Sequence, residues 1–361
     1  MDPQERLFRL RLSLVRGMGS RYFIQILKKF GSVQNFLKST AELSSYNRMS
    51  NELLLKFKNE CYEIDIAKIL RDLKRYGINY IVYGEEDYPF LLSQVHSPPS
   101  VLYYVGDKSL LGKLSVAVVG TRKITSYGAV IVADFVRGLG NAGVVIVSGM
   151  ALGIDAVVHE KTLVGNFDTI AVLGSPLSNP VPYLNYNLFK KISEQGLVLT
   201  EYHVTQKIFP ANFVYRNRII AGLSKAVVVI EAGERSGALI TAQFAFEENR
   251  DVFAVPGDIR REGSRGTNLL IKLNKACLAS SPNDVLQSLG LFKSKQKQVD
   301  VNSMTEIEKR IYDILTADSL GEDQILVKFD IPAADLLASL SIMETKGLIY
   351  RNELGKFCIG Q

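Results

Sequence analysis

The sequence predicts an α/β protein built on a doubly wound, mostly parallel sheet. Short, near-continuous apolar runs rich in β-branched residues recur between about Lys113 and Leu289, as expected for strands covered on both faces. Segments with helical periodicity separate these runs, and this alternation with short connections builds a parallel sheet between two layers of helices. The chain before this region is helical by period, and the chain after it has the element order of a small winged-helix domain.

The predicted strands of the middle region are short apolar runs. They are SVAVVG (115–120), VVIVS (144–148), TIAVL (169–173), LVLT (197–200), AVVVI (226–230) and VFAVP (252–256). Residues 126–143 and 236–249 show the clearest helical patterns between them. The preceding segment contains Asp87-Tyr88-Pro89 and Ser97-Pro98-Pro99, which indicate extended stretches and turns. We therefore assign residues 79–290 to one Rossmann-like domain with an extended lead-in segment.

The first 78 residues are predicted to form a helical domain. Apolar residues recur at helical spacing, and the pattern breaks at Gly17-Met18-Gly19 and at Phe30-Gly31. Two helices joined by a Gly-x-Gly turn outline a helix-hairpin-helix unit, whose backbone N–H groups would face a phosphate. A tight turn between two packed helices explains the same residues, and we favour this simpler interpretation.

The polar residues 291–303 are predicted to be a linker that leads to a winged-helix domain over residues 304–361. Residues 335–340 would form the recognition helix of this domain. They are acidic and apolar, and no basic residue follows until Lys346, whereas a helix that reads DNA carries Arg or Lys. We therefore expect the winged helix to serve protein contacts or packing.

Composition excludes several classes of protein. No apolar run approaches the ~18–20 residues that cross a bilayer, and the N-terminus lacks the apolar core and cleavage site of a signal peptide. Cys61, Cys277 and Cys358 are far apart and suggest neither a disulfide framework nor a zinc site. The 43 basic and 37 acidic residues give a net charge of +6, which permits a polyanionic partner without requiring one. We expect a cytoplasmic protein with no metal, no cofactor and no membrane association.

The residues that follow the predicted strands indicate a binding site for phosphate. Ligands of an open parallel sheet bind at the carboxyl ends of its strands. Glycine lets a ligand approach the backbone there, Ser and Thr supply hydroxyl groups, and the N-termini of the following helices attract anions. The segments at this edge are Gly120-Thr121-Arg122, Ser148-Gly149-Met150-Ala151-Leu152-Gly153, Gly174-Ser175, Glu201-Tyr202, residues 231–237 with Arg235-Ser236-Gly237, and Pro256-Gly257-Asp258.

Four arginines fall at the same edge of the predicted sheet. Arg122 follows the first strand, Arg216 and Arg218 precede the fifth strand, and Arg235 follows it. Each guanidinium would neutralise a phosphate. An internal ion pair explains any single arginine equally well, but four of them at a phosphate-binding edge favour binding.

The acidic and aromatic neighbours of these arginines leave their roles open. Glu201 and Glu231 follow predicted strands and are the candidate partners for internal ion pairs. Phe213 and Tyr215 lie in the basic run FVYRNR, where an aromatic face would stack on a base without regard to sequence. Core packing is the alternative role for Phe213.

Asp155 and His159 form the only local pair that resembles a catalytic site. They lie four residues apart in GIDAVVH and therefore on one helix face, with Ser148 as the candidate nucleophile. We favour structural roles for both, because His96 and His203 complete no recognisable site. The sequence contains no GxxxxGK[ST] motif, and its first strand–helix turn is GTRKIT rather than GxGxxG, which argues against an ATPase and a dinucleotide site. We therefore predict that the protein is not an enzyme.

Several segments resemble the signature blocks of the DprA/Smf family in order and spacing. They are VAVVGTRKITSYG, SGMALGIDAVVHEKTL, TIAVLG, FVYRNRIIAGLSKAVVVIEAGERSGALITAQFAFEENRDVFAVPGDI and GTNLLI. The lead-in DYPFLLSQVHSPPSVLYYVGD and the three-part architecture are also similar to members of this family. The resemblance implies a single-stranded-DNA-binding recombination mediator that protects incoming DNA and loads the recombinase RecA during natural transformation. It also implies a homodimer formed through the Rossmann-like domain, without DNA-cleaving activity.

The resemblance implies a DNA site assembled from four segments of the chain. They are Gly120, Thr121 and Arg122; Ser148, Gly149, Ala151 and Gly153; Phe213, Arg216, Asn217 and Arg218; and Arg235, Ser236 and Gly237. Three places depart from the family pattern: residues 174–182 lack its second Gly, its Asp and its Tyr-Pro, residues 203–206 replace Pro-Pro-Gly-Thr, and Val214 replaces a Pro. All three border the expected pocket.

Two other functions fit parts of the sequence. A Rossmann-like enzyme that cleaves phosphoribosyl bonds would hold a nucleotide at the same edge, but EAGERSGAL stands where such enzymes have paired glycines and a glutamate. A winged-helix transcription factor with an α/β sensor domain is disfavoured by the poorly basic residues 335–340. Nucleoside monophosphates and labelled single strands, offered in parallel, separate the mediator from the enzyme.

Overall fold

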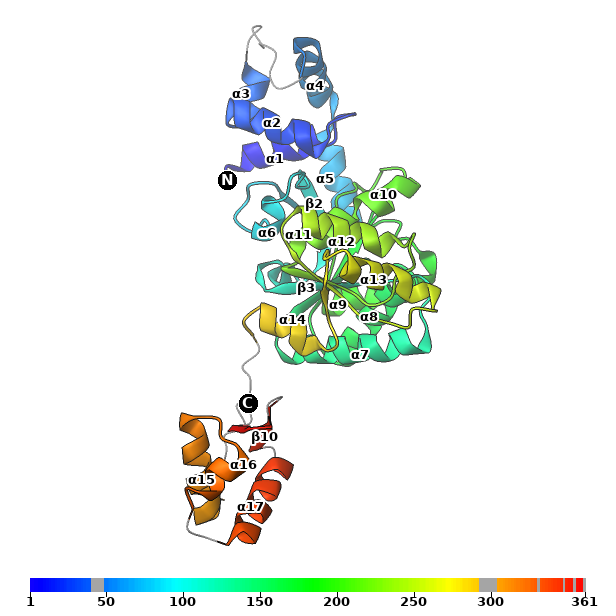
Figure 1. The fold of residues 1–361 in the computed structure, drawn as a ribbon. Coiled ribbons are helices and arrows are strands. Elements are labelled where there is room, and N and C mark those ends of the chain that lie inside the picture. Colours follow the sequence, from blue (N-terminus) through cyan, green and yellow to red (C-terminus); the bar gives the residue numbers. More distant parts are fainter. Residues whose placement is uncertain (40–48, 292–303, 330–331, 347, 353–354, 360–361) are drawn as a thin grey trace. The chain divides into compact units, whose positions relative to one another are not determined.

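The computed structural model describes residues 1–39, 49–291, 304–329, 332–346, 348–352 and 355–359. The chain forms two compact units, Met1–Phe292 and Lys293–Gln361. The first contains the large sheet and its helices, and the second is a small helical unit with a two-stranded sheet (Figure 1). Of the predicted linker over 291–303, all but Leu291 lies outside the described residues.

The N-terminal region is helical: its first four helices pack around a core of their own, whereas Ile69 and Leu73 of the fifth helix pack with residues of the sheet. Its helices are α1 (Pro3–Ser13), α2 (Ser20–Phe30), α3 (Val33–Lys38), α4 (Asn51–Glu63) and α5 (Ile66–Arg75). Leu12 of α1 and Phe23 of α2 are both buried in this core, so Gly17-Met18-Gly19 is a turn between two packed helices. The backbone N–H of Gly19 donates to the carbonyl of Gly17 at 3.0 Å, which satisfies one of the donors in the turn.

The central sheet confirms the predicted fold class. Among the described residues it has nine strands in the order β1-β2-β6-β5-β4-β3-β7-β8-β9, and the strands from β6 to β9 pair in parallel. The strands are β1 (Asn79–Val82), β2 (Val101–Gly106), β3 (Ser115–Val119), β4 (Val145–Ser148), β5 (Thr169–Leu173), β6 (Leu197–Thr200), β7 (Ala226–Val229), β8 (Asp251–Ala254) and β9 (Cys277–Leu278). The six predicted runs correspond to β3 through β8.

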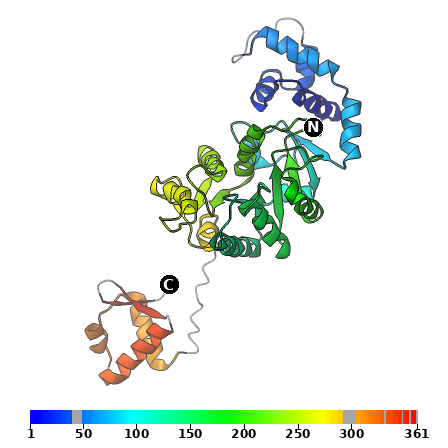
Figure 2. The ribbon, with the colours of Figure 1, turned by 90° about the vertical axis from the view of Figure 1, so that its right-hand side faces the viewer.

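Helices cover both faces of this sheet (Figure 2). Val116 of β3 packs on one side with α7, α8 and α14, and Ala117 on the other with α11 and α12, because successive side chains of a strand point to opposite faces. The remaining helices lie in the connections. Their bounds are α6 (Phe90–Ser93), η1 (Lys108–Gly112), α7 (Ser126–Asn141), α8 (Ile154–Val164), η2 (Tyr183–Asn185), α9 (Tyr186–Gln195), α10 (Pro210–Tyr215), α11 (Asn217–Leu223), α12 (Gly237–Glu247), α13 (Glu262–Lys272) and α14 (Pro282–Ser288).

The lead-in segment adds two antiparallel strands to the edge of the parallel sheet. β1 pairs with β2, and β2 pairs with β6, where Tyr103 lies opposite Thr200. Arg6 of α1 joins the N-terminal helices to this edge, because its guanidinium donates to the carboxylate of Glu85 at 2.6 Å and to the carbonyl of Tyr80 at 2.7 Å. Because β1 and β2 pair with each other and β2 pairs with β6, the lead-in segment is an integral part of the sheet.

The second unit contains α15 (Glu306–Ala317), α16 (Glu322–Leu326) and α17 (Ala333–Thr345), followed by β10 (Ile349–Arg351) and β11 (Phe357–Ile359), which pair antiparallel. Leu336 and Leu340 of α17 are buried in its core. Lys346 is engaged in an ion pair of 2.7 Å with Glu308. The order of described elements agrees with the expected helix, helix-turn-helix and hairpin, whereas the winged-helix assignment itself stays a prediction.

The described residues contain no candidate for a membrane span or a metal centre. No helix there has both the length and the apolar character needed to cross a membrane. Within the same residues, His, Cys, Asp and Glu do not gather in groups of three or more that would hold a metal ion.

Candidate nucleic-acid interface

A pocket lies where the strand order reverses. From β3 the chain passes to β4, β5 and β6 on one side, and then places β7 on the other side of β3. The connections that follow β3 and β7 therefore run in opposite directions and leave a crevice, which is where open α/β sheets bind ligands. A pocket of about 670 Å³ occupies this position and is lined by Gly120 to Lys123 after β3 and by Gly233 to Gly237 after β7.

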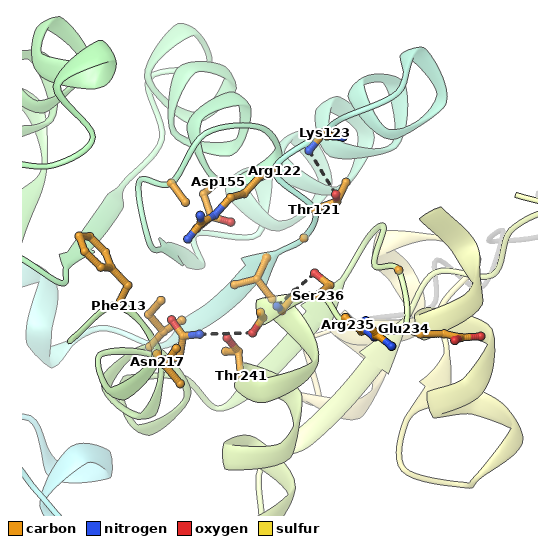
Figure 3. Close-up of a pocket in the computed structure, with 18 of the residues that line it drawn as sticks. Thr121, Arg122, Lys123, Asp155, Phe213, Asn217, Glu234, Arg235, Ser236 and Thr241 are labelled. Carbon is orange, nitrogen blue, oxygen red and sulfur yellow. Dashed lines mark hydrogen bonds between the residues drawn. The ribbon is translucent and has the colours of Figure 1, made fainter. Parts of the chain in front are cut away.

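Four segments that are distant in sequence meet at this pocket, and Figure 3 shows Arg122, Phe213, Asn217 and Arg235 around the same space. Most of the residues predicted for the DNA site line it. These are Gly120, Thr121, Arg122, Ala151, Phe213, Arg216, Asn217, Arg235, Ser236 and Gly237. Ser148, Gly149, Gly153 and Arg218 are outside the lining; Ser148, Gly149 and Arg218 are buried, and Gly153 is half-buried.

The cations that face solvent at the pocket are Arg122, Lys123, Arg235 and Arg265. Within the described part of the chain, no ion pair involves any of them. Sequence reasoning missed Lys123, although it adjoins Arg122, and Arg265, which belongs to α13 after β8. The exposed carboxylates of Glu234 and Glu262 also line the pocket and offset part of its positive charge.

Arg216 supports the pocket from within the sheet. Its guanidinium donates to the carbonyl of Gly149 at 2.7 Å and to the carbonyl of Val172, so it bridges the ends of β4 and β5. Burial lowers the pKa of Arg216 to about 10, against the opposing effect of Asp155, and the side chain still carries its charge at neutral pH. A Cβ atom at Gly149 would lie 2.8 Å from this guanidinium, so the loop needs glycine at that position.

Arg218 forms the internal ion pair that was the alternative to DNA binding. One guanidinium nitrogen lies 2.5 Å from a carboxylate oxygen of Glu201, and the side chains of Arg218 and Glu201 are only 6% and 12% exposed. Burial disfavours the charge on Arg218, but Glu201 and Tyr215 together outweigh this effect, and the pKa of Arg218 is raised. The guanidinium also lies 4.0 Å from the ring centre of Tyr215. Arg218 thus holds the connection between β6 and β7 together.

Glu231 has a different role from Glu201. Its carboxylate accepts hydrogen bonds from the hydroxyl and the backbone N–H of Thr125, at 2.5 and 3.1 Å, and thereby fixes the start of α7. Its carbonyl accepts from the N–H of Thr121 at 2.7 Å. Glu231 therefore positions the turn that carries Arg122 and pairs with none of the arginines among the described residues.

The starts of α8 and α12, both at this edge, differ in what satisfies their N–H groups. At the loop before α8, the buried carboxylate of Asp155 accepts a hydrogen bond from the N–H of Gly149 at 3.2 Å, so the chain supplies its own anion there. Burial raises the pKa of Asp155, although Arg216 acts in the opposite direction. At α12, the cap is the neutral hydroxyl of Ser236, which accepts from the N–H of Ala238 at 3.3 Å (Figure 3). The start of α12 is therefore the one that remains suited to an external anion.

Gly153 fixes the distance between the loops after β3 and β4. It has a φ of +83°, and a Cβ atom there would lie 2.4 Å from the carbonyl oxygen of Thr121. This close approach lets the N–H of Ile154 donate to the same oxygen at 3.0 Å. Gly153 thus acts on the pocket by positioning the turn that carries Arg122.

Phe213 lies half-buried in the wall of the pocket (Figure 3). Its ring packs over Gly174, where a Cβ atom would come within 2.8 Å of it. Gly174 begins the first of the two divergent loops, 174–182. This loop contacts the second, 203–206, through a hydrogen bond of 2.9 Å from the hydroxyl of Ser178 to the carbonyl of Val204. The position of the Phe213 ring is compatible with both expected roles, packing against the chain and stacking on a ligand in the pocket.

The catalytic-looking residues are engaged in structural contacts. The hydroxyl of Ser148 donates to the carbonyl of Val118 at 2.8 Å, and the Nδ1 atom of His159 lies 2.8 Å from the hydroxyl of Thr169. Burial lowers the pKa of His159 to about 3, so the imidazole is neutral at physiological pH. Among the described contacts, the hydroxyl of Ser148 has no hydrogen bond to His159, and only the backbone of Ser148 acts on the imidazole.

Comparisons with known proteins agree with this architecture. Residues 79–290 match the family model described as DNA recombination-mediator protein A. The chain is 37% identical over 295 residues to the protein Smf of Synechocystis sp., which covers 80% of this chain and 74% of that protein.

Two solved structures are similar over nearly their whole length. The X-ray structure of DNA processing protein A (DprA) from Streptococcus pneumoniae matches with a TM-score of 0.69 and 34% identity, covering 78% of this chain and 97% of that chain. DprA from Helicobacter pylori, whose structure concerns a single-stranded DNA binding mode, matches with a TM-score of 0.54 and 30% identity, covering 59% and 97%.

The family match spans more than half of the chain and includes the whole parallel sheet and the pocket at its switch point. The similarity to Smf extends well beyond that span, to 80% of the chain. This chain therefore belongs to the family of DNA recombination-mediator protein A, which comprises the DprA and Smf proteins.

Proposed function

We propose that this protein binds single-stranded DNA in the pocket between the ends of β3 and β7, and that it acts as a mediator of DNA recombination. One observation carries the proposal: exposed cations, among them Arg122 and Arg235, surround a pocket whose wall contains Phe213. The start of α12 adds a site that attracts phosphate. A basic rim, an aromatic ring and a helix N-terminus together match the backbone and the bases of an unpaired strand.

An unpaired strand fits this pocket better than a duplex does. Phe213 is half-buried, so a base reaches its ring only by entering the pocket, and the bases of a duplex are paired and stacked inside the helix. Base–aromatic stacking contributes roughly 1–3 kcal/mol per base and is indifferent to sequence. The relative from Helicobacter pylori, which binds single-stranded DNA, supports the same choice of ligand.

Titration of labelled single strands and duplexes of equal length tests the choice of ligand. Single strands of any sequence should bind more tightly than the duplex, and their affinity should fall steeply as salt rises, because phosphate contacts release counterions. Equal affinity for the two forms would refute the proposed use of the pocket.

Within this function, we propose that the protein protects incoming DNA and loads RecA in the cytoplasm during natural transformation, as its resemblance to the family implies. The direct assay follows ATP hydrolysis by RecA on single strands covered with single-strand-binding protein. Addition of this protein should shorten the lag before hydrolysis. An unchanged lag, in the presence of strands that the protein binds, would remove RecA from the proposal.

We propose further that the protein acts without catalysis. Ser148 and His159 each have a structural hydrogen bond, and the buried imidazole is neutral. Purified protein should show no nuclease, nucleosidase or ATPase turnover. A turnover that is lost in a folded His159→Ala variant would favour the alternative, an enzyme that processes nucleotides.

We also propose a homodimer formed through the Rossmann-like domain. Its edge strand β9 has only two residues, and the apolar side chains of Leu273 and Leu278 near that edge are 53% and 51% exposed. An apolar surface beside an unpaired strand edge favours pairing with a second copy. Sedimentation should give a dimer for the natural chain and a monomer for Leu278→Lys; a natural chain that sediments as a monomer would contradict the proposal.

A further inference from the structure

A near-parallel stack of three aromatic rings lies outside the pocket. The ring centre of Tyr183 in η2 lies 5.7 Å from that of Tyr186 in α9, with 17° between the ring planes. Tyr186 in turn lies 6.0 Å from Phe189, with 20° between the planes. Tyr183 ends the stack and is 78% exposed, so the far face of its ring is open to solvent.

A pair of hydrogen bonds ties this stack to the wall of the pocket. The side-chain amide of Asn185 donates to the carbonyl of Met150 at 2.9 Å and to that of Ala151 at 3.4 Å. Ala151 itself lines the pocket. Tyr183 is only two residues from Asn185, so its ring stands at the same carboxyl edge of the sheet, beyond the loop that follows β4.

The surroundings of the stack carry positive charge. The ammonium group of Lys190 lies 4.9 Å from the ring centre of Tyr186, and Lys190 and Lys191 are both exposed. Aromatic rings interleaved with cations are the arrangement by which proteins follow a single strand without reading its sequence. Because Tyr183 is mostly exposed, its ring remains accessible to a ligand.

We propose that Tyr183 is a second base-stacking residue of the DNA site. A base of the strand that leaves the pocket past Ala151 stacks on the open face of Tyr183, and Lys190 provides a cation for the same stretch of backbone. This inference rests on the proposed function and extends it, because it gives the strand a path from the switch point toward β5 and α9. The flat ring face, the adjoining lysines and the link to the pocket favour a nucleobase over an apolar protein segment.

The lack of tryptophan in the sequence provides a direct probe. The chain has 16 tyrosines and no tryptophan, so Tyr183→Trp introduces a single indole at the end of the stack. Titration with a thymidine oligonucleotide of about 20 nucleotides should quench the fluorescence of this indole. The quenching should occur over the same concentrations at which the fluorescence anisotropy of the labelled oligonucleotide shows binding. Tyr62→Trp, at an exposed position of α4, is the matched control and should keep its fluorescence.

Affinities provide the second measurement. Tyr183→Leu should weaken binding of the long oligonucleotide about fivefold or more, whereas Tyr183→Phe should bind like the natural chain, because stacking needs the ring and not the hydroxyl. Tyr183→Leu should affect an oligonucleotide of about 6 nucleotides much less, since so short a strand engages the pocket without having to extend to Tyr183.

The outcomes separate this inference from the proposed function. If the natural chain binds the long oligonucleotide while the indole of the Tyr183→Trp variant is not quenched, or while Tyr183→Leu binds unchanged, the stacking role is refuted and the pocket stands. In that case Tyr183 and the neighbouring Leu184 would be an apolar surface for a protein partner. If the natural chain binds neither oligonucleotide, the proposed function fails and this inference fails with it.

Discussion

Arg122 and Arg235 differ from Arg216 and Arg218 in their surroundings, although the sequence places all four at one sheet edge. The first two are exposed at the pocket, whereas the second two are buried and bonded to the chain. Residue type and spacing predicted the edge correctly. They could not show which arginine reaches Glu201, because that depends on how the connection between β6 and β7 folds back.

Removal of the Arg218 guanidinium should destabilise the fold. Arg218→Ala leaves the buried carboxylate of Glu201 without its partner, and breaking such a pair typically costs about 3 kcal/mol. Urea denaturation should show this loss in the free energy of unfolding. The double variant Arg218→Ala with Glu201→Gln should recover part of the loss, and a variant as stable as the natural chain would show that the pair contributes nothing.

His159 should make stability depend on pH. The group is neutral in the folded chain down to a pKa of about 3, whereas the unfolded chain binds a proton at pH values below its ordinary pKa of 6.5. Between pH 6.5 and pH 3 the unfolded state therefore binds more protons at this position than the folded state does. The free energy of unfolding falls over that range by up to about 1.4 kcal/mol per pH unit. Above pH 6.5 the imidazole is mostly neutral in both states, and His159 no longer makes the free energy of unfolding depend on pH.

The comparison with His159→Gln isolates this effect from the carboxylates of the chain. The free energy of unfolding of the natural chain should fall more steeply between pH 6.5 and pH 4 than that of His159→Gln, which has no titrating group at this position. Parallel pH profiles for the two proteins would mean that His159 titrates alike in the folded and unfolded states.

At the scale of elements, long apolar runs were predictable and short edge strands were not. The runs that became β3 to β8 are apolar on both faces because helices cover them, so composition alone identifies them. β1 has four residues with its first exposed, and β9 has two exposed residues, so neither shows a periodicity. Their pairing is determined by the sheet that they join.

The second unit should be dispensable for DNA binding. Its α17 turns Leu336 and Leu340 into the core, and Lys346 pairs with Glu308, so the helix offers little to a phosphate backbone. A chain that ends at Leu291 should keep most of the affinity of the natural chain for a short single strand. Loss of binding in a truncated protein that is folded by circular dichroism would place the DNA site in the tail.

At the scale of the molecule, the topology decides which strand ends share a site. The sequence pointed to the carboxyl edge of the whole sheet, whereas the pocket draws on the ends of β3 and β7 and only marginally on β4. Ser148 ends β4 and Gly149 follows it at that edge, yet both are buried and outside the lining. The point where strand order reverses is a property of the complete sheet, and no local pattern reports it.

The dependence of single-strand affinity on salt, measured for Arg122→Ala and Lys225→Ala, tests most directly whether this pocket holds DNA. Arg122 and Lys225 are both exposed, but Arg122 lies at the pocket, whereas Lys225 precedes β7 at the opposite edge of the sheet. Arg122→Ala should lose nearly all binding to a short strand, with a salt slope lower by about 1 where binding remains measurable. Lys225→Ala should bind like the natural chain. A folded Arg122→Ala protein with the affinity and the salt slope of the natural chain would contradict the binding of DNA in this pocket.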